Sequence, residues 1–253
     1  MKFLVVIPAR FKSSRFPGKP LAMIKGKPMI HRVYEQCVKG FNGKIIIATD
    51  NIKIQDYCNK NNLPCELTSE SCMTGTDRVA EISSKHEADY YINVQGDEPV
   101  FNPDDLSLFI NEIRTQKDNY STYAGYTLIK SDDEFFSSQI PKMVFNKKEE
   151  LIYTSRAPIP SNKENKHIKS FKQVCVYGFT REALDKYSEA VNKTPLEEIE
   201  DLELLRFVEI GEKVKMISLS DTAVSVDNPE DILKVEKILE KWNKLNLVIQ
   251  KKE

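Results

Sequence analysis

A dense group of cations and hydroxyls follows the first apolar run of the chain. Residues 8–20 read PARFKSSRFPGKP, and ten consecutive positions within them hold Arg10, Lys12, Ser13, Ser14, Arg15 and Lys19. Guanidinium forks, an ammonium and free backbone N–H groups are what binds phosphate oxygens in proteins. The segment is neither a GxxxxGK[ST] loop nor a GxGxxG loop. It predicts a triphosphate site of another kind, and the alternative is a solvated basic loop.

Two carboxylates lie where a magnesium ion could meet such a triphosphate. Asp97 belongs to the segment QGDEP, which directly follows the apolar run 89–94, and Asp227, in SVDNPED, lies 130 positions further on. Mg²⁺ prefers oxygen ligands, and one carboxylate rarely neutralises a transferring phosphate alone. We therefore predict that both aspartates hold Mg²⁺. The alternatives are a tight turn capped by Asp97 and first-turn acids facing a helix dipole, a role we assign to Glu230 and Asp231.

A third polar segment, residues 74–78 (TGTDR), begins a predicted helix. Its hydroxyls and backbone N–H groups suit the edge of a nucleobase, and Arg78 suits a phosphate or a carboxylate. The alternative is a capped helix with an exposed arginine. The three histidines show neither metal-ligand spacing nor a Ser/Asp partner pattern, and nothing near Cys72 marks it as a nucleophile.

The composition excludes several classes of protein. The chain has 253 residues, 40% of them hydrophobic and 30% charged, which indicates one large folded domain or two small ones. A net charge of −1 argues against a nucleic acid or an anionic membrane as partner. No apolar run reaches the ~18 residues of a membrane span, and the N-terminal run is too short for a signal peptide. Five cysteines without a CxxC favour a reduced, cytoplasmic location.

Apolar runs alternate with helix-like stretches in the first half of the chain. We expect strands at 3–7, 44–49, 64–67 and 89–94, and helices at 28–37, 76–85 and 103–114. This alternation indicates a mostly parallel sheet with helices on both faces. Because ligands bind at the carboxyl ends of strands in such sheets, we expect the polar loops after Ile7, Leu67 and Val94 to meet at one edge.

The second half is less regular. We expect strands at 142–145, 151–154, 173–179 and 213–219, one helix at 195–210 and a final helix that begins at Asn228-Pro229. Asp227 is expected directly before the cap of this helix, after an apolar strand. The polar stretch 157–172 is predicted to be a mobile excursion that folds over the site as a lid. We read residues 1–253 as a single domain, divided at about 1–125, 126–220 and 221–253.

These motifs together resemble one family, the 3-deoxy-manno-octulosonate cytidylyltransferases, also called CMP-KDO synthetases. The matching segments run in the family's order and are VVIPARFKSSRFPGKPLAMIKGKPMIHRVYEQ, IIIATD, TGTDR, INVQGDEP, LIYTSRAPIP, VYGF, PLEEIEDLELLR and VDNPEDI. The resemblance implies a three-layer, GT-A-like nucleotidyltransferase fold with an inserted β-rich lobe for the sugar and for dimerisation. It also implies a cytoplasmic homodimer in which CTP and KDO give CMP-KDO and pyrophosphate with Mg²⁺, in lipopolysaccharide or capsule biosynthesis.

The resemblance also implies roles for individual residues. Catalysis would fall to Lys19, Arg10 and Asp97, with Asp97 and Asp227 as metal ligands. Nucleotide binding would fall to Ala9, Arg10, Ser14, Arg15, Lys19, Thr74, Gly75, Thr76, Arg78 and Gln95. Substrate binding would fall to Lys142, Gln173, Tyr177, Glu200 and Leu204.

The chain departs from the family pattern mainly on the sugar side. Gln173 and Leu204 stand where the family usually has His and Gln, Cys175 lies in the same altered segment, and Cys72 replaces a His before TGTDR. An alternative acceptor therefore stays open, such as an amino-KDO, another ulosonic acid, or a phosphate or phosphonate. A non-catalytic nucleotide-binding relative and a glycosyltransferase are further alternatives, although QGDEP matches a DxD metal motif poorly.

Overall fold

A single large sheet organises the chain. The computed structural model describes residues 1–13, 15–116, 120–190, 192–222 and 224–250, so Ser14 lies outside the described residues. The main path of the sheet has the order β11-β7-β10-β6-β1-β4-β5. These strands are β1 (Phe3–Ala9), β4 (Lys44–Thr49), β5 (Cys65–Leu67), β6 (Tyr90–Val94), β7 (Thr122–Leu128), β10 (Phe171–Phe179) and β11 (Val214–Ser218).

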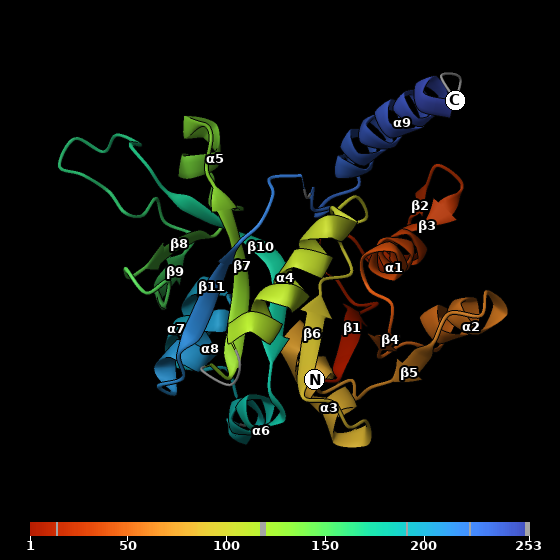
Figure 1. Cartoon of the computed structure of the whole chain (residues 1–253), viewed down its shortest axis with the longest axis horizontal. Helices are drawn as coiled ribbons and strands as arrows, with labels where there is room; N and C mark the ends of the chain where they lie inside the picture. Colours follow the sequence, from red (N-terminus) through yellow and green to blue (C-terminus); the bar gives the residue numbers. More distant parts are fainter. Residues whose placement is uncertain (14, 117–119, 191, 223, 251–253) are drawn as a thin grey trace.

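The sheet is mostly parallel, as predicted. β4, β1 and β6 are parallel neighbours, β5 pairs parallel with β4, and β11 pairs parallel with β7. β10 runs antiparallel to both β6 and β7. Two further strands, β8 (Lys142–Phe145) and β9 (Leu151–Ser155), extend from β10 as an antiparallel lobe, at the left of Figure 1. A small hairpin of β2 (Met23–Ile24) and β3 (Lys27–Pro28) lies apart from the sheet.

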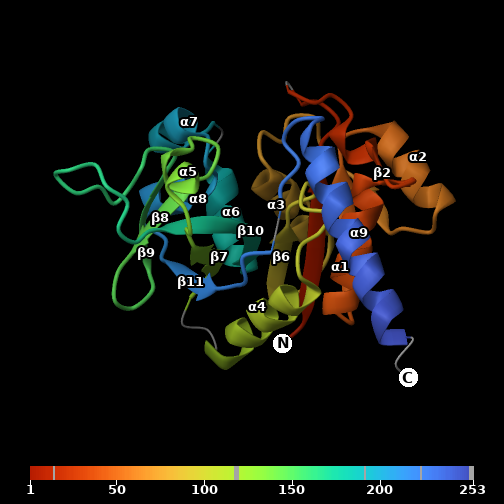
Figure 2. The same ribbon diagram turned by 90° about the horizontal axis from the view of Figure 1, so that it is seen from above.

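Helices cover both faces, which confirms the three-layer α/β expectation (Figures 1 and 2). One face packs against α1 (Met29–Gly40), α2 (Ile52–Lys60) and α4 (Pro103–Gln116). The other packs against α3 (Gly75–Lys85), α6 (Arg181–Glu189) and α8 (Leu204–Glu209). The remaining helices are the short η1 (Lys19–Leu21), α5 (Asp132–Phe136), α7 (Pro195–Glu200) and α9 (Asp231–Gln250).

Strand β1 shows why its sequence is apolar without interruption. Val5 and Ile7 lie in the core under α1 and α4, whereas Leu4 and Val6 lie in the core under α3. Successive side chains of a strand point to opposite faces, so a strand covered on both sides needs apolar residues at every position. Strand β1 is thereby fixed in the sheet, and with it the position at which the basic loop begins.

Three sequence-based expectations about the second half are wrong. The helix expected at 195–210 is two helices, because Asp201 adopts a left-handed conformation (φ 52°) that interrupts it between α7 and α8. The final helix α9 begins at Asp231 rather than at Asn228-Pro229, because residues 228–230 form a turn that precedes it. Residues 171–172 belong to β10 rather than to the polar excursion, and 157–170 form no helix or strand.

The C-terminal helix α9 returns to the N-terminal half. Its residue Val235 joins a small core with Ile24, Met29, Val100 and Val226. Figure 2 shows α9 lying beside α1 and β2, away from the lobe of β8 and β9. In the described part of the chain, no helix combines the length and the apolar character needed to cross a bilayer.

Candidate active site

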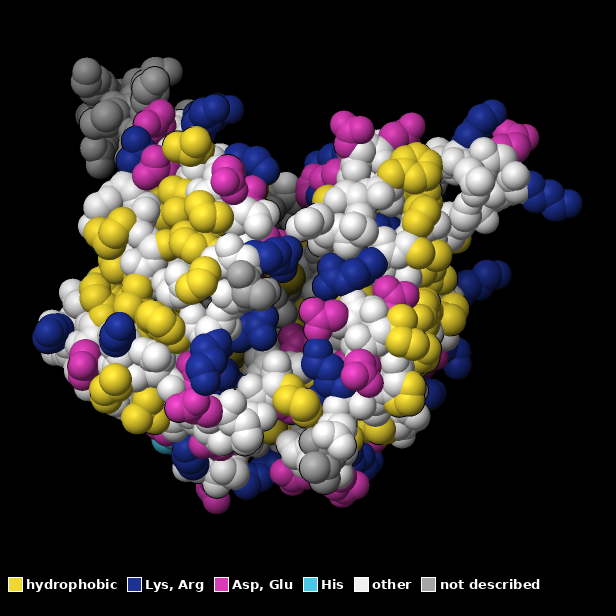
Figure 3. Space-filling view, turned by 180° about the vertical axis from the view of Figure 1, so that it is seen from behind, with side chains coloured by type: hydrophobic (Ala, Val, Ile, Leu, Met, Phe, Trp, Pro, Cys, Tyr) yellow, Lys and Arg dark blue, Asp and Glu magenta, His cyan; other side chains and the backbone are white. Residues whose placement is uncertain are grey.

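A cavity of about 1000 Å³ opens at the carboxyl ends of β1 and β6. Its walls include Pro8–Arg10, Met73–Gly75 and Gln95–Glu98, so the three polar loops do meet at one edge of the sheet as predicted. The lobe supplies the opposite wall. In Figure 3 the space-filling surface is hollowed between the two halves, and Lys and Arg side chains gather around the hollow.

Lys19 brings the two predicted metal ligands together. Its Nζ lies 2.8 Å from Asp97 Oδ2 and 3.9 Å from Asp227 Oδ1, and it donates to the Val226 carbonyl at 2.9 Å. All three side chains are largely shielded from solvent. Because two carboxylate oxygens flank one nitrogen, they also lie within reach of one shared cation.

The donor set fits a magnesium ion. Asp97 Oδ1 is buried and, among the described residues, has no hydrogen-bond partner. A carboxylate oxygen in this condition is a ready ligand for a hard cation. Within the described ranges no group of three or more His, Cys, Asp or Glu residues could hold a metal. The pair therefore suits an ion that takes its other oxygens from a triphosphate and water.

The basic loop is anchored before it reaches the cavity. Gly18 has φ 72°, a left-handed backbone conformation that residues with a Cβ atom rarely adopt. Its N–H donates to the Phe11 carbonyl at 3.0 Å. Arg15 spans the cavity mouth, donating to Asp227 Oδ1 at 3.1 Å and to Gln139 of the lobe at 3.2 Å. Arg10 is exposed on the cavity wall. The cationic side chains of Arg10, Arg15 and Lys19 thus line the same cavity.

Gly96 allows the loop after β6 to approach β1. A Cβ on Gly96 would lie 2.6 Å from the Pro8 carbonyl oxygen, which no side chain tolerates. This close approach places Asp97 and Glu98 in the wall of the cavity. Burial, with the charge of Asp97 as a lesser cause, raises the pKa of Glu98 to about 7.

The TGTDR segment is held by a capping box at the start of α3. Thr74 Oγ1 accepts from the Asp77 N–H at 3.2 Å, and Asp77 Oδ2 accepts from the Thr74 N–H at 2.7 Å. Arg78 is buried rather than exposed: it donates to Asp50 at 2.8 Å and to Thr68 at 2.7 Å. Thr74, Gly75 and Arg78 line the cavity.

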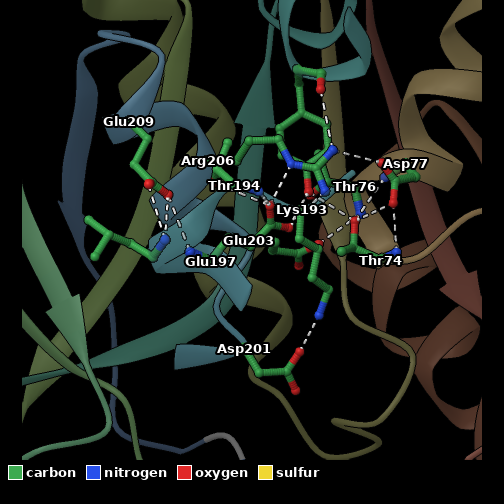
Figure 4. A network of polar contacts seen from close by, with 12 residues as sticks. Thr74, Thr76, Asp77, Lys193, Thr194, Glu197, Asp201, Glu203, Arg206 and Glu209 are labelled. Carbon is green, nitrogen blue, oxygen red and sulfur yellow. Dashed lines mark hydrogen bonds and ion pairs between the residues drawn. The ribbon is translucent and has the colours of Figure 1, made fainter. Parts of the chain in front are cut away.

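A buried ionic network supports this segment from behind (Figure 4). Arg206 is fully buried and donates to both carboxylate oxygens of Glu197, at 2.6 and 2.8 Å, and to Asp77 at 3.2 Å. Its guanidinium also lies over the Tyr187 ring, 3.8 Å from the centroid. Because Asp77 belongs to the capping box, the network fixes the start of α3 from the side of the lobe.

Gln95 and Tyr177 form a second polar chain. Gln95 donates to Glu203 at 3.0 Å and to the Tyr177 hydroxyl at 3.4 Å, and Gln173 donates to the same hydroxyl at 2.5 Å. Glu203 also accepts from the Thr76 N–H at 2.9 Å. Burial raises the pKa of Tyr177 and of Glu203. Gln95, Gln173, Cys175 and Tyr177 all line the cavity.

Among the predicted site residues that the structure describes, four do not line the cavity. Lys142 is fully buried, and its ammonium donates to three backbone carbonyls, those of Ser137, Ile140 and Arg156, each at 2.7 Å. Glu200 is engaged by Ser155 and by the Arg156 N–H. Leu204 is in the core under α8. The fourth is Thr76, whose side chain is buried.

The cavity also has lining residues that the sequence did not single out, and the charged ones among them include Glu134, Arg156, Lys172, Lys193, Asp201, Glu203 and Asp221. Lys172 contacts Glu134 and Asp221. The hydrogen bond from Lys193 lowers the pKa of Asp201, and the charge of Arg10 contributes. Arg156 lies in the family motif LIYTSRAPIP, and Glu203 lies in PLEEIEDLELLR. Their charge within a family motif was the sequence signal that could have identified them as cavity residues.

A basic loop and paired carboxylates at the carboxyl edge of this sheet define a nucleotidyltransferase. Comparison with known proteins narrows the class. The profile of the cytidylyltransferase family matches residues 4–214. A 3-deoxy-manno-octulosonate cytidylyltransferase of Chlamydia pneumoniae is 37% identical over 237 residues, 92% of each chain, and one of Fusobacterium nucleatum is 36% identical over 93% of this chain and 96% of its own. The chain belongs to the 3-deoxy-manno-octulosonate cytidylyltransferase family.

Solved structures agree with this assignment. A CMP:2-keto-3-deoxy-manno-octonic acid synthetase complexed with CTP superposes with a TM-score of 0.88 at 33% identity, over 95% of this chain and 99% of that one. HddC from Yersinia pseudotuberculosis matches with a TM-score of 0.68 at 14% identity, over 94% of this chain and all of that one. The second similarity shows the fold alone.

Proposed function

We propose that the protein transfers CMP from CTP to 3-deoxy-manno-octulosonate and releases pyrophosphate. The observation that carries the proposal is the convergence of Lys19, Asp97 and Asp227 in one cavity of a cytidylyltransferase. The anomeric hydroxyl of the acceptor attacks the α-phosphorus, and the bond from this phosphorus to the bridging oxygen of pyrophosphate breaks. Positioning and charge neutralisation account for most of the catalysis in such a step.

The nucleotide is bound on the wall formed by the basic loop, the α3 start and the β6 loop. Lys19, Arg10 and Arg15 neutralise the triphosphate and the charge that grows on pyrophosphate. Ala9, the last residue of β1, and Ser14, which lies outside the described residues, complete the nucleotide-binding set. Thr74, Gly75 and Gln95 face the cytidine, and Arg78 supports the wall from its buried position. Thr76 acts through its backbone N–H, which holds Glu203.

Asp97 and Asp227 would hold Mg²⁺, which supplies charge neutralisation at the triphosphate and lowers the pKa of the attacking hydroxyl. Lys19 already contacts both carboxylates, so its ammonium has to exchange partners when nucleotide and metal enter. No histidine lines the cavity among the described residues, so the chain offers no imidazole base there.

The acceptor is bound on the lobe side, next to Gln173 and Tyr177. Lys142 and Glu200 are assigned a supporting function, because their contacts lie behind the wall, and Leu204 packs beneath it. Gln173 stands where the family usually has a histidine. Because this change lies on the acceptor side, amino-KDO and other ulosonic acids should be tested as acceptors beside KDO. Pyrophosphate release measured with CTP across this acceptor panel decides among them.

We further propose a cytoplasmic homodimer that serves lipopolysaccharide or capsule biosynthesis. The lobe carries exposed apolar side chains at Phe136, Ile152 and Ile199, the last 79% exposed. Figure 3 shows a column of hydrophobic surface along that side of the molecule. Sedimentation equilibrium tests this proposal. A charged substitution, Ile152→Glu, is expected to shift the protein to the monomer, and an unshifted dimer would place the interface elsewhere.

The substitution Asp97→Asn tests the reaction itself. It is expected to reduce pyrophosphate release from CTP by a factor of about 10³, since charge neutralisation at the phosphate is lost. Asp104→Asn, at an exposed first-turn position of α4, is the matched control. Near-normal turnover of Asp97→Asn would remove Asp97 from the mechanism. Calorimetric binding of Mg·CTP without turnover on any acceptor would instead favour a non-catalytic relative.

A further inference from the structure

Asp227 lies on a segment that has no regular structure of its own. Between the end of β11 at Ser218 and the start of α9 at Asp231, the described residues form neither helix nor strand. Asp97, by contrast, lies only three residues beyond Val94, the last residue of β6. A carboxylate on an irregular segment keeps its direction only through tertiary contacts, so these contacts decide where Asp227 points.

Two of these contacts fix the residue before Asp227. The Val226 N–H donates to the Asp97 carbonyl at 2.9 Å, and the Val226 carbonyl accepts from Lys19 Nζ at 2.9 Å. The Val226 side chain is fully buried in the small core under α9. The two predicted metal ligands are therefore joined by backbone, independently of any ion.

The third contact fixes Asp227 itself. Asp231 Oδ2 accepts from the Asp227 N–H at 3.1 Å and from the Asn228 N–H at 3.0 Å. Asp231 Oδ1 pairs with Lys234 at 2.8 Å. Both carboxylate oxygens are thus engaged. Oδ2 holds the N–H groups on either side of the Asp227 Cα atom, and we call these two hydrogen bonds the Asp231 clamp. The direction in which the Asp227 side chain points depends on this clamp.

We propose that Asp231 is a positioning residue that sets the metal affinity of the site through Asp227. The inference rests on the proposed function, in which Asp227 is a metal ligand. Helix α9 gives the clamp a fixed base, because Val235 is buried against Ile24 and Met29 and the Lys25 N–H donates to Glu236 at 3.0 Å. Asp231 also lines the cavity, but its carboxylate oxygens are engaged by the N–H groups of Asp227 and Asn228 and by Lys234, so we assign it no direct contact with metal or nucleotide.

Two simpler roles for Asp231 have matched controls near the start of the same helix. A helix-dipole role would be shared by Glu230, the exposed acid directly before the first residue of α9. A role limited to the ion pair with Lys234 would be lost equally in Lys234→Ala. Neither control touches the backbone of Asp227, so Glu230→Gln and Lys234→Ala separate the clamp from both.

The test measures Mn²⁺ binding to the full-length enzyme with saturating CTP, by the electron paramagnetic resonance signal of free Mn²⁺. Groups that orient a metal ligand typically change affinity by about 10–100-fold when removed. We expect Asp231→Ala to weaken Mn²⁺ binding at least about tenfold. Asp231→Asn, whose amide oxygen still accepts both N–H groups, should stay within about twofold. The rate of pyrophosphate release by Asp231→Ala should recover at saturating Mg²⁺.

Further variants make the result decisive. Asp231→Glu keeps the charge but displaces the carboxylate, so it should also weaken binding, and it replaces the alanine variant should that one fail to fold. Unchanged Mn²⁺ affinity in Asp231→Glu, or equal losses in Glu230→Gln or Lys234→Ala, would overturn the proposal. In an Asp227→Asn background, Asp231→Ala should cause no further loss, and additive losses would also overturn it. Unchanged affinity in Asp227→Asn alone would overturn the metal role of Asp227, and this inference with it.

Discussion

The ammonium of Lys19 lies 2.8 Å from Asp97 Oδ2, at the end of a 78-residue separation along the chain. The contact joins the loop after β1 to the loop after β6, which are neighbours in the sheet. Asp227 Oδ1 lies on the other side of the same nitrogen, at 3.9 Å. In the free enzyme one lysine therefore neutralises the carboxylates that the proposed metal requires.

Replacing Lys19 should have opposite effects on catalysis and on metal binding. Lys19→Met is expected to lower kcat by a factor of about 10², because a cation at the leaving pyrophosphate is lost. Mn²⁺ binding without CTP should become stronger, because the competing ammonium is gone. Steady-state kinetics and Mn²⁺ titration measure the two effects, with the exposed Lys60→Met as control. A change in the KM for CTP with kcat unchanged would show a binding role only.

Lys142 should matter for stability more than for substrate binding. Lys142→Met leaves three buried carbonyl acceptors without their donor, which is expected to lower the free energy of unfolding by about 3 kcal/mol. Urea unfolding measures the loss, and Lys147→Met, at an exposed position, serves as control. Unchanged stability together with a raised KM for the acceptor would return Lys142 to the substrate site.

Gln173 and Leu204, the two main departures from the family pattern, should behave differently. Leu204→Gln places an amide in the apolar core under α8 and is expected to lower stability by about 2–3 kcal/mol. Gln173→His changes a side chain on the cavity wall, so kcat/KM should change between acceptors while the unfolding midpoint in urea stays nearly constant. Equal acceptor preference in the wild type and Gln173→His would exclude position 173 as a specificity determinant.

The Asp221 carboxylate should give the fold part of its acid sensitivity. Burial opposes its ionisation, but hydrogen bonds from Lys172 and Lys130 outweigh burial and lower the pKa of Asp221. A lowered pKa stabilises the folded state above the unfolded value of about 3.9, and this stabilisation is lost as the pH falls through the folded value.

The substitution Asp221→Asn tests this pH dependence. It is expected to lower the free energy of unfolding at pH 7 by about 1–2 kcal/mol and to have little effect near pH 2. Asp185→Asn, at an exposed position in α6, is the control. A loss that is the same at both pH values would show that the charge of Asp221 is not its source.

The local pattern predicted the N-terminal half well. Its strands are buried on both faces, so continuous apolar runs identify them in the sequence. Because ligands bind at the carboxyl ends of strands in such sheets, Arg10, Gly75 and Gln95 could be expected at one edge, where the structure has them. The rest of the chain was harder to predict, since β7, α5 and α6 lacked a clear sequence signal, and nothing local predicted the left-handed Asp201 that separates α7 from α8. Tertiary packing decided those positions.

The site shows the same division. Lys19, Asp97 and Asp227 were predicted from charge at strand ends and from the family motifs. Lys142 and Glu200 carry equally suggestive charges, but their partners are backbone and side-chain groups behind the cavity wall. Sequence motifs do not distinguish a side chain that faces a ligand from one that builds the wall, because both need the same residue type.

The buried contact of Arg206 with Asp77 and Glu197 restricts how the enzyme can open. Because Arg206 and Glu197 both belong to the α7–α8 segment, pulling this segment away from α3 would keep their ion pair but break the buried contact of Arg206 with Asp77 and the hydrogen bond from the Thr76 N–H to Glu203. Arg15 and Gln139 meet at an exposed mouth, where a comparable separation is nearly free. We therefore expect the cavity to open at the Arg15–Gln139 contact rather than at the start of α3.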